Sequence, residues 1–139
     1  MILLKRVYDE ASPNDGFRVL VDRLWPRGLS KERARVDAWL REIAPSTDLR
    51  KWFHSHPDSW QDFRRRYLAE LRAASANEQL QEFYGILDEN AVVTLLFASK
   101  VTQQNNATVL KELVEGMRKP PQGTGARRAR VQRRKRSDA

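Results

Sequence analysis

Cationic side chains follow directly after two apolar runs of the sequence. Arg23 and Arg27 come just after residues 19–21, and Lys100 comes just after residues 91–98. Guanidinium and ammonium groups hold phosphate and carboxylate through charge-assisted hydrogen bonds. These residue types therefore predict a binding site for an anionic small molecule, phosphorylated or carboxylated.

Four other side chains of the same two segments are candidates for that site. Asn105 begins a predicted helix, whose N-terminus adds backbone N–H groups and a positive dipole end. Asp22 is a candidate base or an ion-pair partner for a neighbouring arginine. Ser99 can donate a hydrogen bond but has no base beside it in sequence to make it a nucleophile. Trp25 is a candidate stacking plane or a hydrophobic plug, and a purely structural role stays open for the whole set.

Two histidines, His54 and His56, lie two positions apart. Two imidazoles at this spacing can chelate a metal, but no cluster supplies a third ligand, so we predict no metal site. Because an imidazole titrates near neutrality, His56 is a candidate proton shuttle. The sequence has no Walker loop and no glycine-rich dinucleotide motif, so we predict no cofactor.

The composition sets the class of protein. The chain has 139 residues, 40% of them hydrophobic, and no cysteine. This length predicts one domain, and the lack of cysteine favours a cytoplasmic protein over a secreted one. No apolar run is long enough to span a bilayer, so we predict no membrane partner. Nothing in the sequence indicates the oligomeric state.

The net charge of +8 is concentrated at one end of the chain. Residues 1–117 carry 17 basic and 17 acidic side chains, whereas residues 118–139 carry 9 basic and 1 acidic. The second stretch is rich in arginine, proline and glycine, which predicts a disordered basic tail after the domain. Such a tail either binds nucleic acid without sequence specificity or only keeps the protein soluble.

The apolar spacing predicts an α/β domain: a small, mostly parallel sheet flanked by about five helices. A helix starting at the cap Ser30 and stopping before Pro45 is expected from the spacing of its apolar residues, and Ser46 or Thr47 caps a second. The expected strands are residues 2–8, 17–24 and 91–98. Of the other helices, one starts near residue 57, one contains residues 80–87, and the last runs over about residues 105–117. If the last two strands are parallel neighbours, the candidate residues that follow them face one crevice.

Several segments together resemble the DUF488 family, in its YeaO-like branch. The resemblance implies an α/β fold over about residues 3–117 and says little about activity. It also implies an acid and a histidine where this chain has Val101 and Gln104, which favours binding without turnover. Whether the protein is an enzyme stays open, and an accessory nucleic-acid-binding protein is the alternative. The segments are VDRLWPRGLSKERA, WLREIAPS, LRKWFHSHP, WQDFRRRYLAEL, VTLLFASK and NNATVLKEL.

Overall fold

The computed structural model describes residues 1–118, with side chains through residue 116. The predicted tail lies outside the described residues, apart from its first position. Contacts along the chain group residues 1–109 into one unit and the residues from 110 onward into another. The fold and the site below belong to the first of these units.

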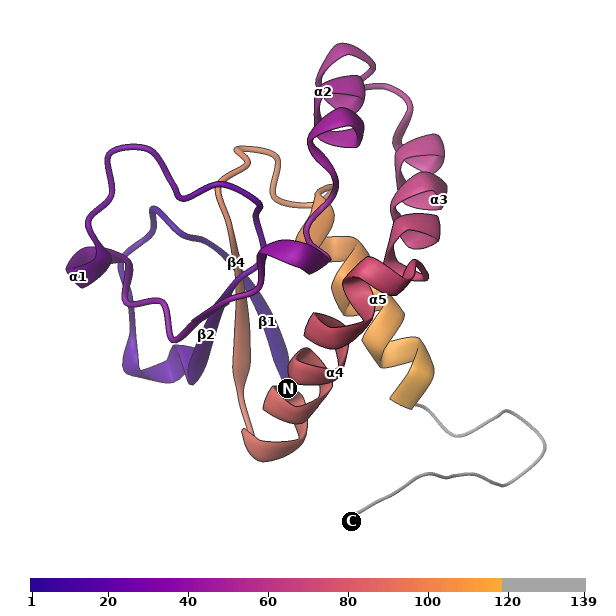
Figure 1. Cartoon of the computed structure of the whole chain (residues 1–139). Helices are drawn as coiled ribbons and strands as arrows, with labels where there is room; N and C mark the ends of the chain where they lie inside the picture. Colours follow the sequence, from indigo (N-terminus) through magenta and orange to yellow (C-terminus); the bar gives the residue numbers. More distant parts are fainter. Residues whose placement is uncertain (119–139) are drawn as a thin grey trace. The chain divides into compact units, whose positions relative to one another are not determined.

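Four strands form one parallel sheet within the described residues, in the spatial order β1-β4-β2-β3 (Figure 1). β4 lies inside the sheet and all five of its residues are buried, as expected for a parallel strand covered on both faces. The predicted parallel α/β fold is thereby confirmed. The strands are β1 (Ile2–Arg6), β2 (Phe17–Leu20), β3 (Ala38–Trp39) and β4 (Val93–Phe97).

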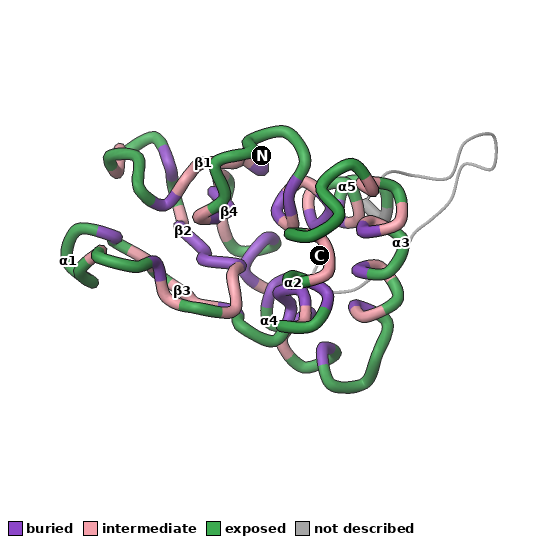
Figure 2. Tube along the Cα trace, turned by 90° about the horizontal axis from the view of Figure 1, so that it is seen from above, coloured by how far each residue is buried: buried purple, intermediate pink, exposed green. Residues whose placement is uncertain are grey.

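The helices lie unevenly about the sheet. α2, α3 and α4 stand on one side of it, and the one-turn helix α1 lies on the other (Figures 1 and 2). Two 3-10 turns, η1 and η2, lie between the strands and helices of the first half of the chain. The helices are α1 (Lys31–Ala34), α2 (Thr47–Ser55), α3 (Trp60–Leu71), α4 (Ala74–Glu89) and α5 (Asn106–Arg118), and the turns are η1 (Pro13–Asp15) and η2 (Arg41–Ile43).

Different kinds of structure cover the two faces of the sheet (Figure 2). On the helical side, α3 and α4 bury the rings of Phe63, Tyr67 and Phe83. On the α1 side, a smaller cluster forms around Leu20 and Leu96, and irregular backbone packs against it. The segment between β2 and β3, which carries several of the candidate site residues, therefore covers one face of the sheet itself.

The helix predicted from Ser30 to Pro45 is wrong beyond its first turn. Ser30 does cap a helix, since its hydroxyl accepts the N–H of Arg33 at 3.2 Å, but α1 ends at Ala34. Arg35 then adopts a left-handed backbone conformation, with φ of 50° and ψ of 47°, which no helix can continue.

Buried Arg18 on β2 explains why the chain leaves the helix there. Its Nη2 donates to the carbonyl of Ala34 at 2.7 Å and its Nε to that of Arg35 at 2.9 Å. The N–H of Asp37 donates to the carbonyl of Arg18 at 2.8 Å, and β3 then pairs with β2. Pairing with the sheet thus overrides the helical spacing of the apolar residues.

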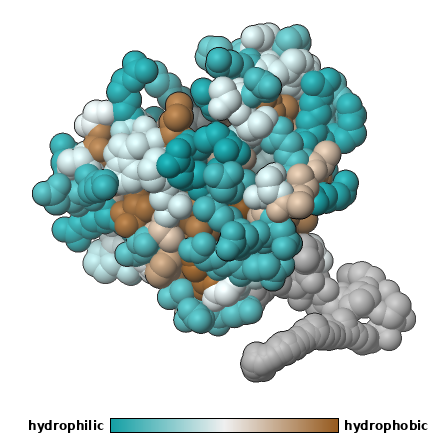
Figure 3. Space-filling view, viewed as in Figure 1, coloured by the Kyte–Doolittle hydropathy of each residue, from teal (hydrophilic) through white to brown (hydrophobic). Residues whose placement is uncertain are grey.

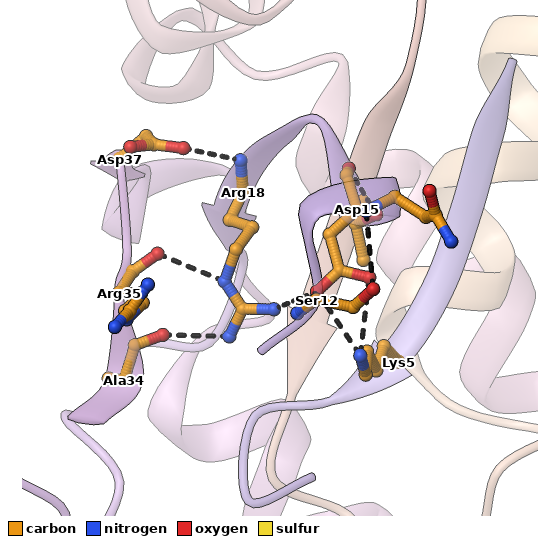
Figure 4. A network of polar contacts seen from close by, with 9 residues as sticks. Lys5, Ser12, Asp15, Arg18, Ala34, Arg35 and Asp37 are labelled. Atoms are coloured by element: carbon orange, nitrogen blue, oxygen red, sulfur yellow. Dashed lines mark hydrogen bonds and ion pairs between the residues drawn. The ribbon is translucent and has the colours of Figure 1, made fainter. Parts of the chain in front are cut away.

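A network of charges accompanies this strand pairing (Figure 4). The carboxylate of Asp15 accepts from Lys5 Nζ at 3.1 Å, from the N–H of Ser12 at 3.0 Å and from Arg18 Nη1. Burial alone would raise the pKa of Asp15, but the Ser12 N–H and the two cations hold that pKa below its ordinary value. The hydroxyl of Thr94 on β4 donates to the carbonyl of Asp15 at 2.6 Å, so the network also reaches the central strand.

None of the helices in residues 1–118 combines the length and apolar composition needed to cross a bilayer.

Candidate ligand-binding cleft

β2 and β4 are parallel neighbours, so the segments that follow them meet at one edge of the sheet. A cleft of about 550 Å³ opens there. Figure 3 shows the surface hollowed at the upper edge, between the loop after β2 and α2. The predicted site residues that line the cleft are Asp22, Arg23, Trp25, Ser99, Lys100 and Asn105, and they are joined by Leu24, Pro26, Pro45, Arg50, Phe53, His54, Phe63, Ala98, Gln104 and Asn106.

Asp22 ties together the three segments that form the floor of the cleft. Its Oδ2 accepts the N–H of Ala98 at 2.8 Å and its Oδ1 accepts Nδ2 of Asn106 at 3.0 Å. Burial raises the pKa of Asp22, and these two hydrogen bonds and the charge of Arg50 only partly offset that effect. Because both carboxylate oxygens are engaged, the first role of Asp22 is to hold the ends of β2 and β4 and the start of α5.

Arg23 lines the cleft, but its guanidinium is mostly engaged by the protein. Nε donates to the carbonyl of Pro45 at 3.1 Å and Nη2 to that of Ala44 at 3.0 Å. Nη1 lies 3.6 Å from a carboxylate oxygen of Glu42. Arg23 thus fastens the segment before α2 to the end of β2, and it offers few donors to a ligand.

The segment before α2 is also held from the other side, by α3. The backbone N–H of Ser46 donates to Glu70 Oε1 at 2.8 Å, and the Ser46 hydroxyl donates to Oε2. The hydroxyl of Tyr67 donates to the carbonyl of Ile43, and burial raises the pKa of Tyr67 well above its ordinary value, which keeps it a phenol. The Ser46 oxygen in turn accepts the N–H of Leu49 at 3.1 Å, which confirms Ser46 as the cap of α2.

This anchoring places one face of α2 along the cleft. Arg50, Phe53 and His54 follow at positions i, i+3 and i+4, which lie on the same side of a helix. Arg50 and His54 are exposed, and neither makes an ion pair or a side-chain hydrogen bond within the described residues. Two cationic or ionisable groups therefore face the cleft with their donors available.

The loop between β4 and α5 supplies the remaining cation. Arg6 on β1 donates to the carbonyls of Ala98 and Ser99, both at 3.0 Å. The Ser99 hydroxyl accepts the N–H of Val101 at 3.1 Å, so it is held in a local turn and has no base next to it. Lys100 is exposed and forms no ion pair in the described part of the chain.

Asn105 and Trp25 are both tied into the fold. Asn105 is buried, its Oδ1 accepts the N–H of Thr108 at 3.1 Å and its Nδ2 donates to the carbonyl of Val101 at 2.8 Å, so its amide caps α5. The indole N–H of Trp25 donates to the carbonyl of Leu29 at 2.6 Å, and its ring meets that of Trp39 edge-on at 5.5 Å. Trp25 is part of the cleft lining, but its indole N–H is already engaged by the protein.

Two predicted site residues lie outside the cleft lining. Arg27 is exposed, and only its carbonyl is engaged, by the hydroxyl of Tyr8 at 2.9 Å. His56 is exposed at the end of α2, where its ring stacks on Trp52 at 4.7 Å and Nδ1 lies 2.8 Å from the Trp52 carbonyl. Neither Arg27 nor His56 is therefore placed to contact a ligand in the cleft directly.

Within residues 1–118, no three histidine, cysteine, aspartate or glutamate side chains gather in a way that could hold a metal ion.

A family model described as "Inactive DUF488-N3 subclade" matches residues 1–129. The chain belongs to the DUF488 family. It is 44% identical over 116 residues to the uncharacterized protein YeaO of Escherichia coli, covering 84% of this chain and 98% of YeaO. It is 38% identical over 115 residues to the uncharacterized protein Rv3073c of Mycobacterium tuberculosis, covering 83% and 94% of the two chains. No solved structure is significantly similar to it.

Two positions of this DUF488 domain bear on its chemistry. The resemblance implies an acid and a histidine at positions 101 and 104, and this chain has valine and glutamine there. Val101 is 57% exposed and lies outside the cleft lining, whereas Gln104 is part of it. The loop of this DUF488 domain therefore offers an amide where an imidazole would titrate.

Sequence reasoning did not place Arg50, His54 or Asn106 in the cleft, although it weighed His54 together with His56 as a metal ligand. A signal for the first two was present, because the cap at Ser46 fixes the helical phase and places them on the same side as Phe53. Asn106 had no such signal, because its amide donates across the fold to Asp22.

Proposed function

We propose that this domain binds a small phosphorylated or carboxylated molecule in the cleft and does not turn it over. The observation that carries the proposal is the set of Arg50, His54 and Lys100, which line one cleft and form no ion pair within the described residues. The one carboxylate in the lining, Asp22, already accepts hydrogen bonds on both oxygens. An anion entering the cleft therefore meets Arg50 and Lys100 before either has formed an ion pair with a carboxylate of the described residues.

Available donors also favour binding energetically. A buried ion pair repays its desolvation only when its geometry is good, but exposed cations lose little solvation when a ligand approaches. A phosphate or carboxylate held by Arg50 and Lys100 would gain charge-assisted hydrogen bonds from two different elements of the fold. Such a ligand bridges α2 and the loop after β4.

Separate observations favour binding without turnover. Ser99 has no base beside it, and Asp22 is engaged by Ala98 and Asn106, so neither is arranged as a nucleophile or a free base. The matching family model is described as an inactive subclade, which favours binding over catalysis.

The experiment measures thermal stabilisation and affinity with inorganic phosphate, phosphate monoesters and small carboxylates. A ligand at one hundred times its Kd should stabilise the wild type by about 2.7 kcal/mol. Arg50→Ala and Lys100→Ala should each weaken binding by roughly 1.5–3 kcal/mol, the usual loss for a charged hydrogen bond, and leave the melting temperature without ligand nearly unchanged.

Arg27→Ala is the matched control, because it removes an exposed arginine outside the cleft lining. It should bind as the wild type does. If Arg27→Ala and Arg50→Ala weaken binding equally, the cleft is not the site and the attraction is only that of overall charge.

Nucleic-acid binding through the basic tail stays a prediction from the sequence, as does a cytoplasmic location. Deleting residues 119–139 separates the two functions. Loss of polyanion binding with retained phosphate stabilisation would assign them to different parts of the chain.

A further inference from the structure

The cleft has an aromatic wall beside its cations. Phe53 on α2 is half-buried and stacks on the buried ring of Phe63 on α3, with centroids 4.3 Å apart and an interplanar angle of 21°. Both rings line the cleft. Because Phe53 is backed by a second ring, it is held in place and has little freedom to turn away from a ligand.

A second ring faces the cleft from a different segment. Trp25 is fixed by its indole hydrogen bond to Leu29 and by its edge-on contact with Trp39, packs partly against the core cluster around Leu20, and is also part of the cleft lining. Its neighbour Leu24 is 60% exposed and also lines the cleft. Apolar surface is thus presented from both the β2 side and the α2 side.

Two of the charged residues of the cleft lie on the same helix as one of these rings. On α2, Arg50 precedes Phe53 by three positions and His54 follows it by one, so the charged groups and the ring share a helical face. An inorganic anion would use the cations alone. It would leave the rings of Phe53 and Trp25 and the side chain of Leu24 in contact with water.

We propose that the ligand carries its anionic group on a flat aromatic ring, so that Arg50 and Lys100 hold the anion while Phe53 and Trp25 contact the ring. This inference rests on the proposed function, since it names the ligand class of the same cleft. The volume of about 550 Å³ lies within the usual range of small-molecule sites and accommodates a ring with several substituents. Gln104, exposed in the lining and without a hydrogen bond in the described residues, adds an amide that can pair with a polar group on the ring edge.

The experiment compares pairs of probes that carry the same anionic group, one on an aromatic ring and one on a short alkyl chain. Phenyl phosphate is compared with ethyl phosphate, and benzoate with propionate, so that the two arms also show which anion the site prefers. The ring should improve the affinity of the wild type by about five- to tenfold. Phe53→Leu and Trp25→Leu should each reduce that preference at least twofold and leave the affinity for ethyl phosphate or propionate nearly unchanged.

Two further variants separate the ring from the charge. Trp52→Leu replaces an aromatic residue on the same helix that does not line the cleft, and it should keep the full preference. Arg50→Ala should weaken both members of a pair by the same factor and keep their ratio. Because Trp25→Leu and Phe53→Leu change different elements, a folding defect in one leaves the other as a test.

The outcomes distinguish this inference from the proposed function. Equal affinity for phenyl and ethyl phosphate, and for benzoate and propionate, overturns the aromatic ligand class and leaves an anion site in place. Phenol binding as tightly as phenyl phosphate overturns the role of the cations. Failure of all four anions and of inorganic phosphate to bind overturns the proposed function itself.

Discussion

Two groups of charges in this domain, on different segments, are used in different ways. In the network of Figure 4, Asp15 and Arg18 are 5% and 4% exposed, and all three nitrogens of the Arg18 guanidinium donate to acceptors in the protein. In the cleft, Arg50 and Lys100 are exposed and form no ion pair in the described residues. The first group holds strands together, and the second remains available to a ligand.

The role of an arginine depends more on the acceptors that its guanidinium binds than on its position in the cleft. Arg23 lines the cleft, yet it donates to the carbonyls of Ala44 and Pro45 and so resembles Arg18. Arg50 lies on the same cleft and has no acceptor among the described residues. Its bonding assigns Arg23 to the structural group.

Replacing Arg18 should have the largest effect. Arg18→Met keeps much of the apolar stem but leaves the Asp15 carboxylate and two carbonyls without their buried donor, so we expect a loss of about 3–5 kcal/mol in the free energy of unfolding. Urea denaturation measures it. Arg65→Met is the control, because Arg65 pairs with Asp62 on the exposed side of α3 and should cost at most about 1 kcal/mol. Similar losses for the two variants would remove the distinction between buried and exposed pairs.

Replacing Arg23 tests its assignment to the structural group. Arg23→Met should lower the free energy of unfolding by roughly 1–3 kcal/mol, since two backbone carbonyls lose their donors. Arg50→Ala should change it by less than about 0.5 kcal/mol, the usual range for a surface substitution. Denaturation curves for the two variants side by side decide the matter. A stable Arg23→Met that has lost phosphate binding would place Arg23 with the ligand-binding cations instead.

The carboxylates of Asp15 and Asp22 should give opposite pH dependences. The pKa of Asp15 is lowered in the folded chain, so its stabilisation is present above the unfolded value, near 3.8, and is lost as pH falls through the folded pKa. The pKa of Asp22 is raised, so its contribution is present below the unfolded value and is lost as pH rises through the folded pKa.

Asparagine variants measured by urea denaturation between about pH 3 and pH 7 reveal this difference. The deficit of Asp15→Asn relative to the wild type should shrink toward low pH, by about 1 kcal/mol. The deficit of Asp22→Asn should instead shrink toward neutral pH, where the wild type holds a buried charge. Parallel profiles for the two variants would contradict the assignment of opposite pKa shifts.

Much of the sheet could be predicted from the sequence, but the early end of the helix that starts after Ser30 could not. The apolar run that becomes β4 indicated a strand buried on both faces, and the start of β2 was also predicted, although β2 ends at Leu20 and not at residue 24. The segment after Ser30 carries helical spacing as far as Ile43, but Arg18 takes the carbonyls of Ala34 and Arg35. No local pattern shows that a distant guanidinium will end a helix.

The candidate site, too, could be predicted only in part. The crevice at the ends of β2 and β4 follows from their parallel pairing, and six of the predicted site residues line it. The contribution of α2 was missed, because its placement depends on contacts from α3: Tyr67 binds the carbonyl of Ile43 and Glu70 binds Ser46. Arg27 and His56 were proposed from charge and residue type, which do not show the direction of a side chain.

The loop that carries Lys100 is fastened at both ends. Arg6 and Asp22 hold Ala98, by its carbonyl and its N–H respectively, and the amide of Asn105 holds the carbonyl of Val101. The backbone beside Lys100 is therefore ordered before any ligand arrives, and binding needs to immobilise mainly the lysine side chain. The entropy lost on association should be small, and association should proceed without a slow conformational step.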